Sequence, residues 1–294
     1  VPPQAPEGTS MNQPPIHLGL PKGHMAGGVQ QLLGDAGITV TPTARGYRPV
    51  ISLPGFEVKI LKPQNIVEML DLGTRDVGFA GADWVAELRA DLIEVLDTGM
   101  DTVQLVAAAD ESWEQFPERR LVVATEYLNL TETWVKEQDL DAEIIRSYGA
   151  TEVFPPEDAD VIVDNSATGA TLRANGLKVF EVLGESSTRL YASQRAMADP
   201  VTRERITDLA LLLESVLNAR RRVMLEVNAA PDRLDALVAL LPSMREATVA
   251  PLYGNQGFAV RAAVPRNERP GLIPAIKAAG GTDLVVTNLS QIVP

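Results

Sequence analysis

The sequence lacks cysteine altogether and contains only two histidines, His17 and His24. Without cysteine the chain can form neither disulfide bonds nor thiolate metal sites. Two histidines are too few for a metal cluster built from several imidazoles. These absences exclude disulfide-rich scaffolds and the common structural zinc sites, and they leave the cellular compartment open.

Positive charge is also scarce, because 26 Lys and Arg face 39 Asp and Glu, for a formal net charge of −13. Such an acidic surface disfavours non-specific binding to nucleic acid and attraction to anionic lipid, although it leaves room for a local basic pocket. No apolar run approaches the length of a membrane-spanning helix. We therefore expect no nucleic-acid partner, no membrane association and a cytoplasmic location.

The remaining composition is typical of a globular protein. Hydrophobic residues make up 45% and charged residues 22% of the chain. A length of 294 residues suffices for two or three domains. The N-terminus lacks the apolar core and basic flank of a signal peptide, and we expect residues 1–14 to form a disordered tail.

Short apolar runs alternate with segments of helical periodicity as far as residue 221. Strands are expected at 16–20, 57–61, 76–81, 103–109, 120–124, 143–146, 161–164 and 187–192. Helices are expected from about 24 to Gly37 and at 64–72, 83–90, 130–138, 171–181 and 202–222. This alternation predicts an α/β architecture with largely parallel strands. We assign residues 15–107 and 186–221 to lobe I of a two-lobed core, and residues 108–185 to lobe II.

Residues 222–294 follow a different order of elements, β-α-β-β-α-β, which is the ferredoxin-like arrangement. The long helix that precedes this domain ends in three consecutive arginines, Arg220 to Arg222. Cations at a helix C-terminus complement the helix dipole. The cluster therefore favours a solvated helix end over a phosphate site.

One segment, residues 160–177, carries a pattern with chemical meaning. Val161–Val163 predicts a buried strand, and Asp164 follows at its carboxyl end, where α/β sheets bind ligands. The turn Thr168–Thr171 then opens a helix whose free N–H groups, with two hydroxyls, suit a phosphate. An acidic residue just upstream suits ribose hydroxyls, so the segment indicates a phosphorylated sugar. The alternative is a helix that is simply capped by Thr168.

The same segment resembles the phosphoribosyl-pyrophosphate motif of the ATP phosphoribosyltransferase family. Residues 20–23 resemble the opening loop of that family, and residues 73–83 resemble its "G-x-x-D-L-G…T-G-x-D" stretch. Gly149 and Glu152 resemble "G-S-V-E". Residues 248–252 and 257–260 resemble the regulatory domain of the long form, so the resemblance extends from 16 to 293.

This resemblance implies a two-lobed, periplasmic-binding-protein-like catalytic core with the active site between its lobes, and a C-terminal ferredoxin-like regulatory domain. It implies a glycosyltransferase that condenses ATP with phosphoribosyl pyrophosphate to N1-phosphoribosyl-ATP and pyrophosphate, the first step of histidine biosynthesis. It also implies Mg²⁺, feedback inhibition by histidine, and a homo-oligomer between dimer and hexamer. The transition state would resemble an oxocarbenium ion, so the protein would act by positioning and electrostatics.

The resemblance also carries site residues over to this chain, none of them as an acid or base. The phosphoribosyl-pyrophosphate site would comprise Glu152, Asp164, Ala167, Thr168, Gly169, Ala170 and Thr171. The ATP or pyrophosphate side would comprise Lys22, Gly23, Arg45, Lys62 and Asp83. The regulatory ligand would contact Thr248, Ala250 and Leu252, and the metal ligands stay unassigned.

The sequence departs from the family pattern in a consistent direction, toward less positive charge. His24 stands where the family has arginine, Lys62 replaces another arginine, and Glu126 replaces a lysine. Arginine binds phosphate in a bidentate manner and lysine does not, so the second change is not conservative. One explanation is ordinary sequence drift at positions that do not contact a substrate. The alternatives are a paralogous phosphoribosyltransferase with a different acceptor, or a non-catalytic regulatory protein that binds a small ligand.

Overall fold

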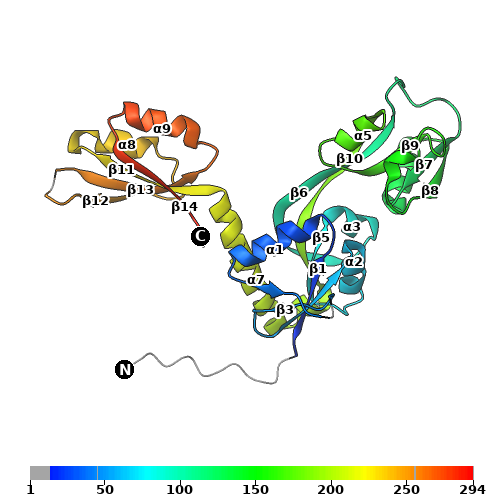
Figure 1. Ribbon diagram of the computed structural model, residues 1–294, viewed down its shortest axis with the longest axis horizontal. Helices are drawn as coiled ribbons and strands as arrows, with labels where there is room; N and C mark the ends of the chain where they lie inside the picture. The colour runs from blue at the N-terminus through cyan, green and yellow to red at the C-terminus, as the bar shows by residue number, and fades with distance from the viewer. Residues whose placement is uncertain (1–13, 45, 255, 294) are drawn as a thin grey trace. The chain divides into compact units, whose positions relative to one another are not determined.

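The computed structural model describes residues 14–44, 46–254 and 256–293. Within this range the chain divides into two compact units (Figure 1). The first unit ends at Ala210, and the second contains Leu211 onward together with Asp35–Gly37. The expected disordered tail lies outside the described residues apart from Pro14.

The first unit is built on one eight-stranded sheet with the order β4-β1-β5-β10-β6-β9-β7-β8. Its strands are β1 (Ile16–Pro21), β4 (Phe56–Leu61), β5 (Val77–Gly81), β6 (Leu92–Asp110), β7 (Leu121–Thr125), β8 (Ala142–Arg146), β9 (Val161–Ser166) and β10 (Leu177–Ser193). A small hairpin, β2 (Val40–Thr41) with β3 (Val50–Ile51), stands apart from this sheet. The parallel strands expected from the sequence form two groups, β4-β1-β5 and β9-β7-β8.

Two long antiparallel strands, β6 and β10, separate the parallel groups and run from one lobe into the other (Figure 1). The first lobe's β5 pairs with β10 through Thr188–Ala192, whereas the second lobe's β9 pairs with β6 through Gln104–Ala109. Each lobe is therefore a parallel sheet extended by one end of the same two strands. The lobe boundaries expected at 107/108 and 185/186 stay predictions.

The helix expected at 171–181 is wrong for its second half. Helix α5 (Ala170–Ala174) ends after five residues, and β10 begins at Leu177. Gly176 has a φ of 68°, a left-handed conformation that glycine adopts without strain and that ends the helix. The following Leu-Lys-Val-Phe-Glu includes β-branched and aromatic side chains and pairs with the end of β6 from Asp110 backwards.

The other helices of the first unit lie close to the positions expected from periodicity, except for the short helix Gln194–Ala198, which the sequence pattern did not predict. They are α1 (Met25–Asp35), α2 (Pro63–Asp71), α3 (Ala82–Glu87), α4 (Leu128–Glu137), α6 (Gln194–Ala198) and α7 (Pro200–Arg220), which continues into the second unit. Helix α2 illustrates why: proline occupies its start, and Ile66, Val67 and Leu70 form a fully buried face. Ile66 approaches Gly19 and Gly78, where a Cβ would lie 3.1 and 2.6 Å from its side chain. The two glycines therefore let α2 approach the sheet closely.

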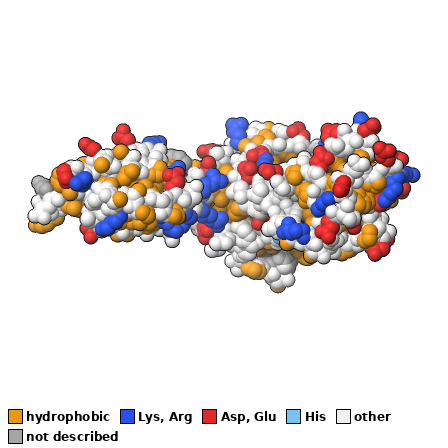
Figure 2. All heavy atoms as spheres, turned by 90° about the horizontal axis from the view of Figure 1, so that it is seen from above, with side chains coloured by type: hydrophobic (Ala, Val, Ile, Leu, Met, Phe, Trp, Pro, Cys, Tyr) orange, Lys and Arg blue, Asp and Glu red, His pale blue; other side chains and the backbone are white. Residues whose placement is uncertain are grey.

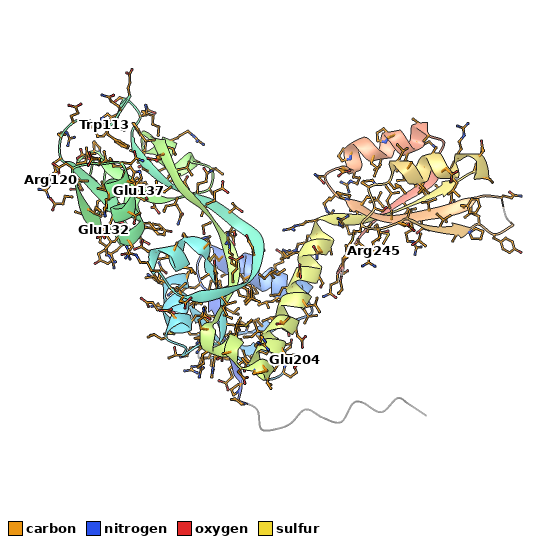
Figure 3. All side chains as sticks on the ribbon, turned by 180° about the vertical axis from the view of Figure 1, so that it is seen from behind. Trp113, Arg120, Glu132, Glu137, Glu204 and Arg245 are labelled. Atoms are coloured by element: carbon orange, nitrogen blue, oxygen red, sulfur yellow. The ribbon has the colours of Figure 1, made fainter. Side chains whose placement is uncertain are left out.

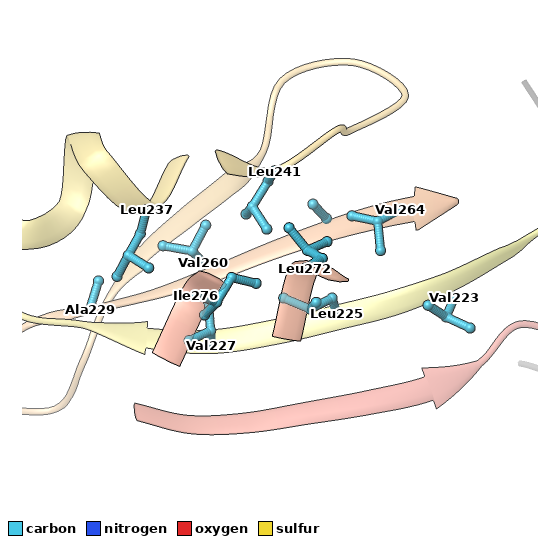
Figure 4. Packing of buried hydrophobic residues seen from close by; sticks show 11 residues of the cluster. Val223, Leu225, Val227, Ala229, Leu237, Leu241, Val260, Val264, Leu272 and Ile276 are labelled. Carbon is cyan, nitrogen blue, oxygen red and sulfur yellow. The ribbon is translucent and has the colours of Figure 1, made fainter. Parts of the chain in front are cut away.

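The second unit has the ferredoxin-like order that the sequence predicts. Its elements are β11 (Arg222–Ala229), α8 (Leu234–Leu240), β12 (Thr248–Pro251), β13 (Phe258–Pro265), α9 (Arg269–Ala278) and β14 (Thr282–Asn288). The sheet is antiparallel with the order β12-β13-β11-β14. The core lies between sheet and helices and includes Leu225, Val227, Leu237, Val260 and Ile276, all fully buried (Figure 4).

No helix in the described part of the chain combines the length and apolarity needed to cross a bilayer. Basic side chains gather in a few groups on the face seen in Figure 2, among acidic side chains that are spread more widely. Hydrophobic side chains lie between them without forming a single continuous patch on that face.

Candidate active site

The turn that joins β9 to α5 has the form expected of a phosphate-binding loop. Gly169 precedes the helix with a φ of 68°, in the left-handed region. A Cβ at this position would lie 2.9 Å from Nη1 of Arg173, because that guanidinium folds back over the turn. Glycine is therefore favoured by the left-handed backbone conformation, whereas the flexible end of the Arg173 side chain could move aside for a Cβ.

Hydrogen bonds within the turn hold its shape. The Gly169 N–H donates to Oγ of Ser166 at 3.1 Å, and Arg173 Nη2 donates to the Thr168 carbonyl at 3.0 Å. The N-cap residue of α5 is Gly169, so no side chain caps the helix, and the contact from the Ala170 N–H to Oγ1 of Thr168 is long, 3.4 Å. Ala167, Thr168, Ala170 and Thr171 are all exposed. With only five residues in α5, a bound phosphate would be held by these amides and hydroxyls and by Arg173, more than by a helix dipole.

Asp164 lies on β9 just before this turn and is largely buried. The pKa of its carboxyl group is raised to about 6, first by burial and also by the nearby carboxylates of Glu126 and Glu152, while hydrogen bonds from the Asn165 N–H and the Thr151 hydroxyl act in the opposite direction. Glu152 belongs to a short 3-10 turn that follows Gly149 and Ala150, both with positive φ. The structure thus gathers the predicted residues Glu152 and Asp164 beside the predicted turn.

A chain of hydrogen bonds connects this region with lobe I. The Tyr127 hydroxyl donates to Oδ2 of Asp83 at 2.6 Å and accepts from Nδ2 of Asn165 at 2.8 Å. Ser186 of β10 donates to the other oxygen of Asp83 at 2.7 Å. Burial and the neighbouring Asp83 raise the pKa of Tyr127 far above its ordinary value, so its hydroxyl stays protonated. Asp83 is therefore linked through Tyr127 to the residue that follows Asp164.

A hollow of about 360 Å³ lies between the lobes and next to this network. Residues of α2 and α3 line one side, and Glu126 and the segment Arg146–Tyr148 line the other. Two of the departures from the family pattern, Lys62 and Glu126, line it together. Gln64 also lines it, and its Oε1 is buried without a partner among the described atoms. Glu126 belongs both to the hollow, which it lines, and to the surroundings of Asp164, because its negative charge raises the pKa of Asp164.

The remaining predicted residues of the ATP side lie on lobe I. Lys22 and Gly23 are exposed in the turn after β1, where Gly23 has a φ of 86°. The ammonium of Lys22 lies 5.7 Å from the centre of the Tyr47 ring. Arg45 lies outside the described residues. Lys62 thus lines the hollow together with residues of lobe II, and Asp83 accepts a hydrogen bond from Tyr127 of lobe II. Lys22, by contrast, contacts Tyr47 of lobe I.

The three predicted regulatory residues lie in the second unit. Thr248 and Ala250 are exposed on β12, the edge strand of the ferredoxin-like sheet, and Leu252 follows it. Thr248 also lines a hollow of about 410 Å³, together with Arg245 and Arg261. The assignment of these residues to a regulatory ligand stays a prediction.

Sequence reasoning missed several residues of the site, namely Tyr127, Asn165, Ser166, Arg173 and Gln64. A signal existed for Arg173, since it lies four residues after Gly169 and thus one helical turn away. For Tyr127 the partners lie 44 and 38 residues away in sequence, and no local pattern indicates them.

Fold and site together define a class of protein: a two-lobed α/β core of the periplasmic-binding-protein type, with a glycine-containing turn before α5 and a ferredoxin-like domain attached. A family model described as ATP phosphoribosyltransferase matches residues 62–215, and one described as HisG, C-terminal domain, matches residues 219–291. The chain belongs to the ATP phosphoribosyltransferase family.

Individual relatives agree with the family models. An ATP phosphoribosyltransferase from Pelotomaculum thermopropionicum is 35% identical over 289 residues, which cover 95% of this chain and 99% of the relative. One from Chlorobium phaeovibrioides is 35% identical over 286 residues, covering 95% and 97%. A solved ATP phosphoribosyl transferase (HisG:HisZ) complex from Thermotoga maritima superposes with a TM-score of 0.62 at 23% identity, over 69% of this chain and 98% of that chain, and supports the fold.

Proposed function

We propose that the chain condenses ATP with phosphoribosyl pyrophosphate, and that the cleft described above is where it does so. The reaction forms N1-phosphoribosyl-ATP and pyrophosphate and begins histidine biosynthesis. The observation that carries the proposal is the position of the phosphate-binding turn and Asp164 beside the hollow between the lobes. One region can thus hold the sugar phosphate and the adjoining hollow can hold the second substrate.

In this reaction N1 of the adenine forms a bond to the anomeric carbon, and the bond from that carbon to pyrophosphate breaks, its electron pair leaving with pyrophosphate. The turn with Arg173 holds the 5′-phosphate, and the ionised Asp164 accepts hydrogen bonds from ribose hydroxyls. Asp164, Glu126 and Glu152 create a negative potential that stabilises the positive charge developing on the ribose. No side chain need act as a nucleophile, because the enzyme works by positioning.

A divalent metal, Mg²⁺ in our proposal, fits the site when it arrives with a substrate. Among residues 14–44, 46–254 and 256–293, no three His, Asp or Glu side chains are grouped to hold an ion by themselves. Mg²⁺ however needs only one or two carboxylates when phosphates complete its shell. Asp164 and Glu152 would hold it, and a cation there would relieve their mutual repulsion. Bound Mg²⁺ would neutralise charge on the leaving pyrophosphate.

A second candidate function follows from Glu126 and Lys62 in the hollow. A carboxylate that faces the second substrate disfavours a triphosphate and favours a less anionic acceptor. The alternative is therefore a phosphoribosyltransferase that uses the same sugar donor with another base. Histidine inhibition through β12, homo-oligomerisation and a cytoplasmic location are further parts of the proposal.

The test is product formation with ATP, phosphoribosyl pyrophosphate and Mg²⁺, followed by chromatography of the nucleotides. We expect phosphoribosyl-ATP and an equal amount of pyrophosphate, and loss of both when a chelator removes the metal. Substituting Glu126→Lys should lower the KM for ATP under the first candidate. Absence of product from folded protein across pH and metal ions would reject the ATP reaction, and turnover with another base would favour the second candidate.

A further inference from the structure

Four arginines line a hollow of about 630 Å³ in the second unit. Arg220, Arg221 and Arg222 come from the end of α7 and the start of β11, and Arg266 follows β13. The sequence indicated only the first three, as a solvated helix end. The structure adds the fourth arginine and the hollow that all four share.

Two of these guanidinium groups are held in place by neutral partners. Arg266 donates to the carbonyl oxygens of Arg220 and Arg222 at 3.0 and 3.3 Å, and to Oδ1 of Asn288 at 3.1 Å. Arg222 donates to the Ala263 carbonyl at 3.3 Å. These contacts fix the side chains without neutralising their charge, so both groups are preorganised to receive an anion.

The other two arginines differ from each other. Arg220 forms an ion pair of 2.7 Å with Asp35, which belongs to the same unit, so its charge is balanced. Arg221 is exposed, and no carboxylate in the described part of the chain forms an ion pair with it. The carbonyl end of α7 offsets only about half a unit of charge. A substantial positive charge therefore stays uncompensated here, in a chain whose net charge is −13.

We propose that this hollow binds a small polyphosphate, either an inorganic one or the phosphate chain of a nucleotide. Guanidinium groups match phosphate oxygens in a bidentate manner. The volume lies within the roughly 300–1,000 Å³ of small-molecule sites. A nucleic acid fits less well, because the net charge of −13 of the whole chain would repel a long polyanion. The site is separate from the cleft, since none of its lining residues belongs to the first unit.

The test is calorimetric titration of the full chain with inorganic tripolyphosphate at low salt. Thr171→Ala is introduced first, so that binding at the cleft turn does not obscure the signal. We expect binding that weakens as salt rises, and an affinity about tenfold lower once Arg221→Gln and Arg222→Gln are added, since charge-assisted hydrogen bonds are lost. Arg245→Gln is the matched control, because Arg245 is exposed in the same unit and lines a different hollow (Figure 3).

Absence of tripolyphosphate binding, or equal affinity with and without the two substitutions, would overturn the proposal. Arg221→Gln alone guards against misfolding, because it disturbs no ion pair in the described structure. A parallel titration with ATP, with and without Arg221→Gln and Arg222→Gln, separates the two sources, because only ATP bound at this hollow is sensitive to these substitutions. A loss of ATP affinity larger than the loss of tripolyphosphate affinity assigns the site to a nucleotide, and an equal or smaller loss assigns it to the inorganic anion. A short duplex DNA that binds more tightly than both would contradict the small-ligand assignment.

Discussion

Asp164 combines a proposed role in substrate binding with a cost to stability. Its folded-state pKa of about 6 lies above the value of about 4 for an unfolded chain. The stability that this group contributes is therefore complete below pH 4 and is lost as the pH rises through 6. Asp164→Asn cannot ionise and should not show this loss. The free energy of unfolding of the variant minus that of the wild type should therefore be about 3 kcal/mol larger at pH 8 than at pH 4.

Urea denaturation at several pH values measures this difference. Glu157→Gln, an exposed carboxylate on the same lobe, provides the control and should show no such trend. A difference between wild type and Asp164→Asn that does not change between pH 4 and pH 8 would show that the carboxyl group titrates normally.

Arg75 is a second residue with a cost to stability. It is only 6% exposed, and its Nη1 has no hydrogen-bond partner among the described atoms. Burial, with the nearby Arg48, lowers its pKa. Because an unpaired buried polar group is destabilising, Arg75→Met should raise the free energy of unfolding by about 1–2 kcal/mol.

The matched control is Arg120→Met, because Arg120 is exposed and forms only a surface ion pair with Glu143 (Figure 3). Its effect on stability should be small. The urea midpoints of the two variants measure these effects on stability. A clear loss of stability in Arg75→Met would mean that the Arg75 charge is stabilised by carboxylates such as Asp76 and Glu57.

Local sequence was sufficient to predict the strand, the glycine turn and the start of the helix at 161–171, because the apolar strand, the glycine and the threonines lie within a dozen residues. It was insufficient for Tyr127 and Ser186, whose bonds to Asp83 span 44 and 103 residues. Such contacts depend on how the lobes meet, which no local pattern encodes. The environment of Asp164 was unpredictable for the same reason.

Helix α4 begins without a side-chain cap of its own, and α3 supplies one. The carboxylate of Glu87 accepts hydrogen bonds from the N–H groups of Asn129 and Leu130 at 3.1 and 3.0 Å, and it is 2% exposed. These bonds join the two lobes. Glu87→Ala should therefore cost about 1–3 kcal/mol, since it removes the cap and leaves two half-buried N–H donors without their carboxylate partner.

Denaturation of Glu87→Ala beside Glu132→Ala measures the effect of the cap. Glu132 is exposed on the same helix and should contribute little (Figure 3). Equal stability of the two variants would mean that water replaces the carboxylate at the start of α4.

The expected and observed elements differ mainly at α5 and β10. Helical periodicity continues past Gly176, but the strand register with β6 prevails from Leu177 onward. A strand of 17 residues that serves two lobes is unusual, and its pairing partner lies far away in sequence. Tertiary pairing thus overrides the local pattern where the chain passes between lobes.

Separate cores predict separate unfolding of the two units. Ile276 is fully buried in the second core, and Gly281 lies so close to it that a Cβ would be 2.6 Å from its Cγ2. Ile276→Ala should cost about 2–5 kcal/mol in the second unit alone. Calorimetry should show one transition moved to lower temperature and the other unchanged, whereas Lys277→Ala, an exposed neighbour, should move neither.

A single shared transition, or an equal shift of both, would contradict independent cores. The ferredoxin-like order was predictable because each of its elements is short, regular and adjacent in sequence to its neighbours. The eight-stranded sheet was only partly predictable, because β6 and β10 join lobes that the sequence presents as separate segments.

The proposed function stands on the segment from Asp164 to Thr171 as the phosphoribosyl-pyrophosphate site. Calorimetric titration with phosphoribosyl pyrophosphate and Mg²⁺ tests it, using wild type, Asp164→Ala with Thr171→Ala, and Thr133→Ala as a control exposed on α4. We predict that the double variant binds at least about 100-fold more weakly, because it loses a charged and a neutral hydrogen-bonding group, while the control binds normally. Unchanged affinity in the folded double variant would mean that the turn is only a helix cap.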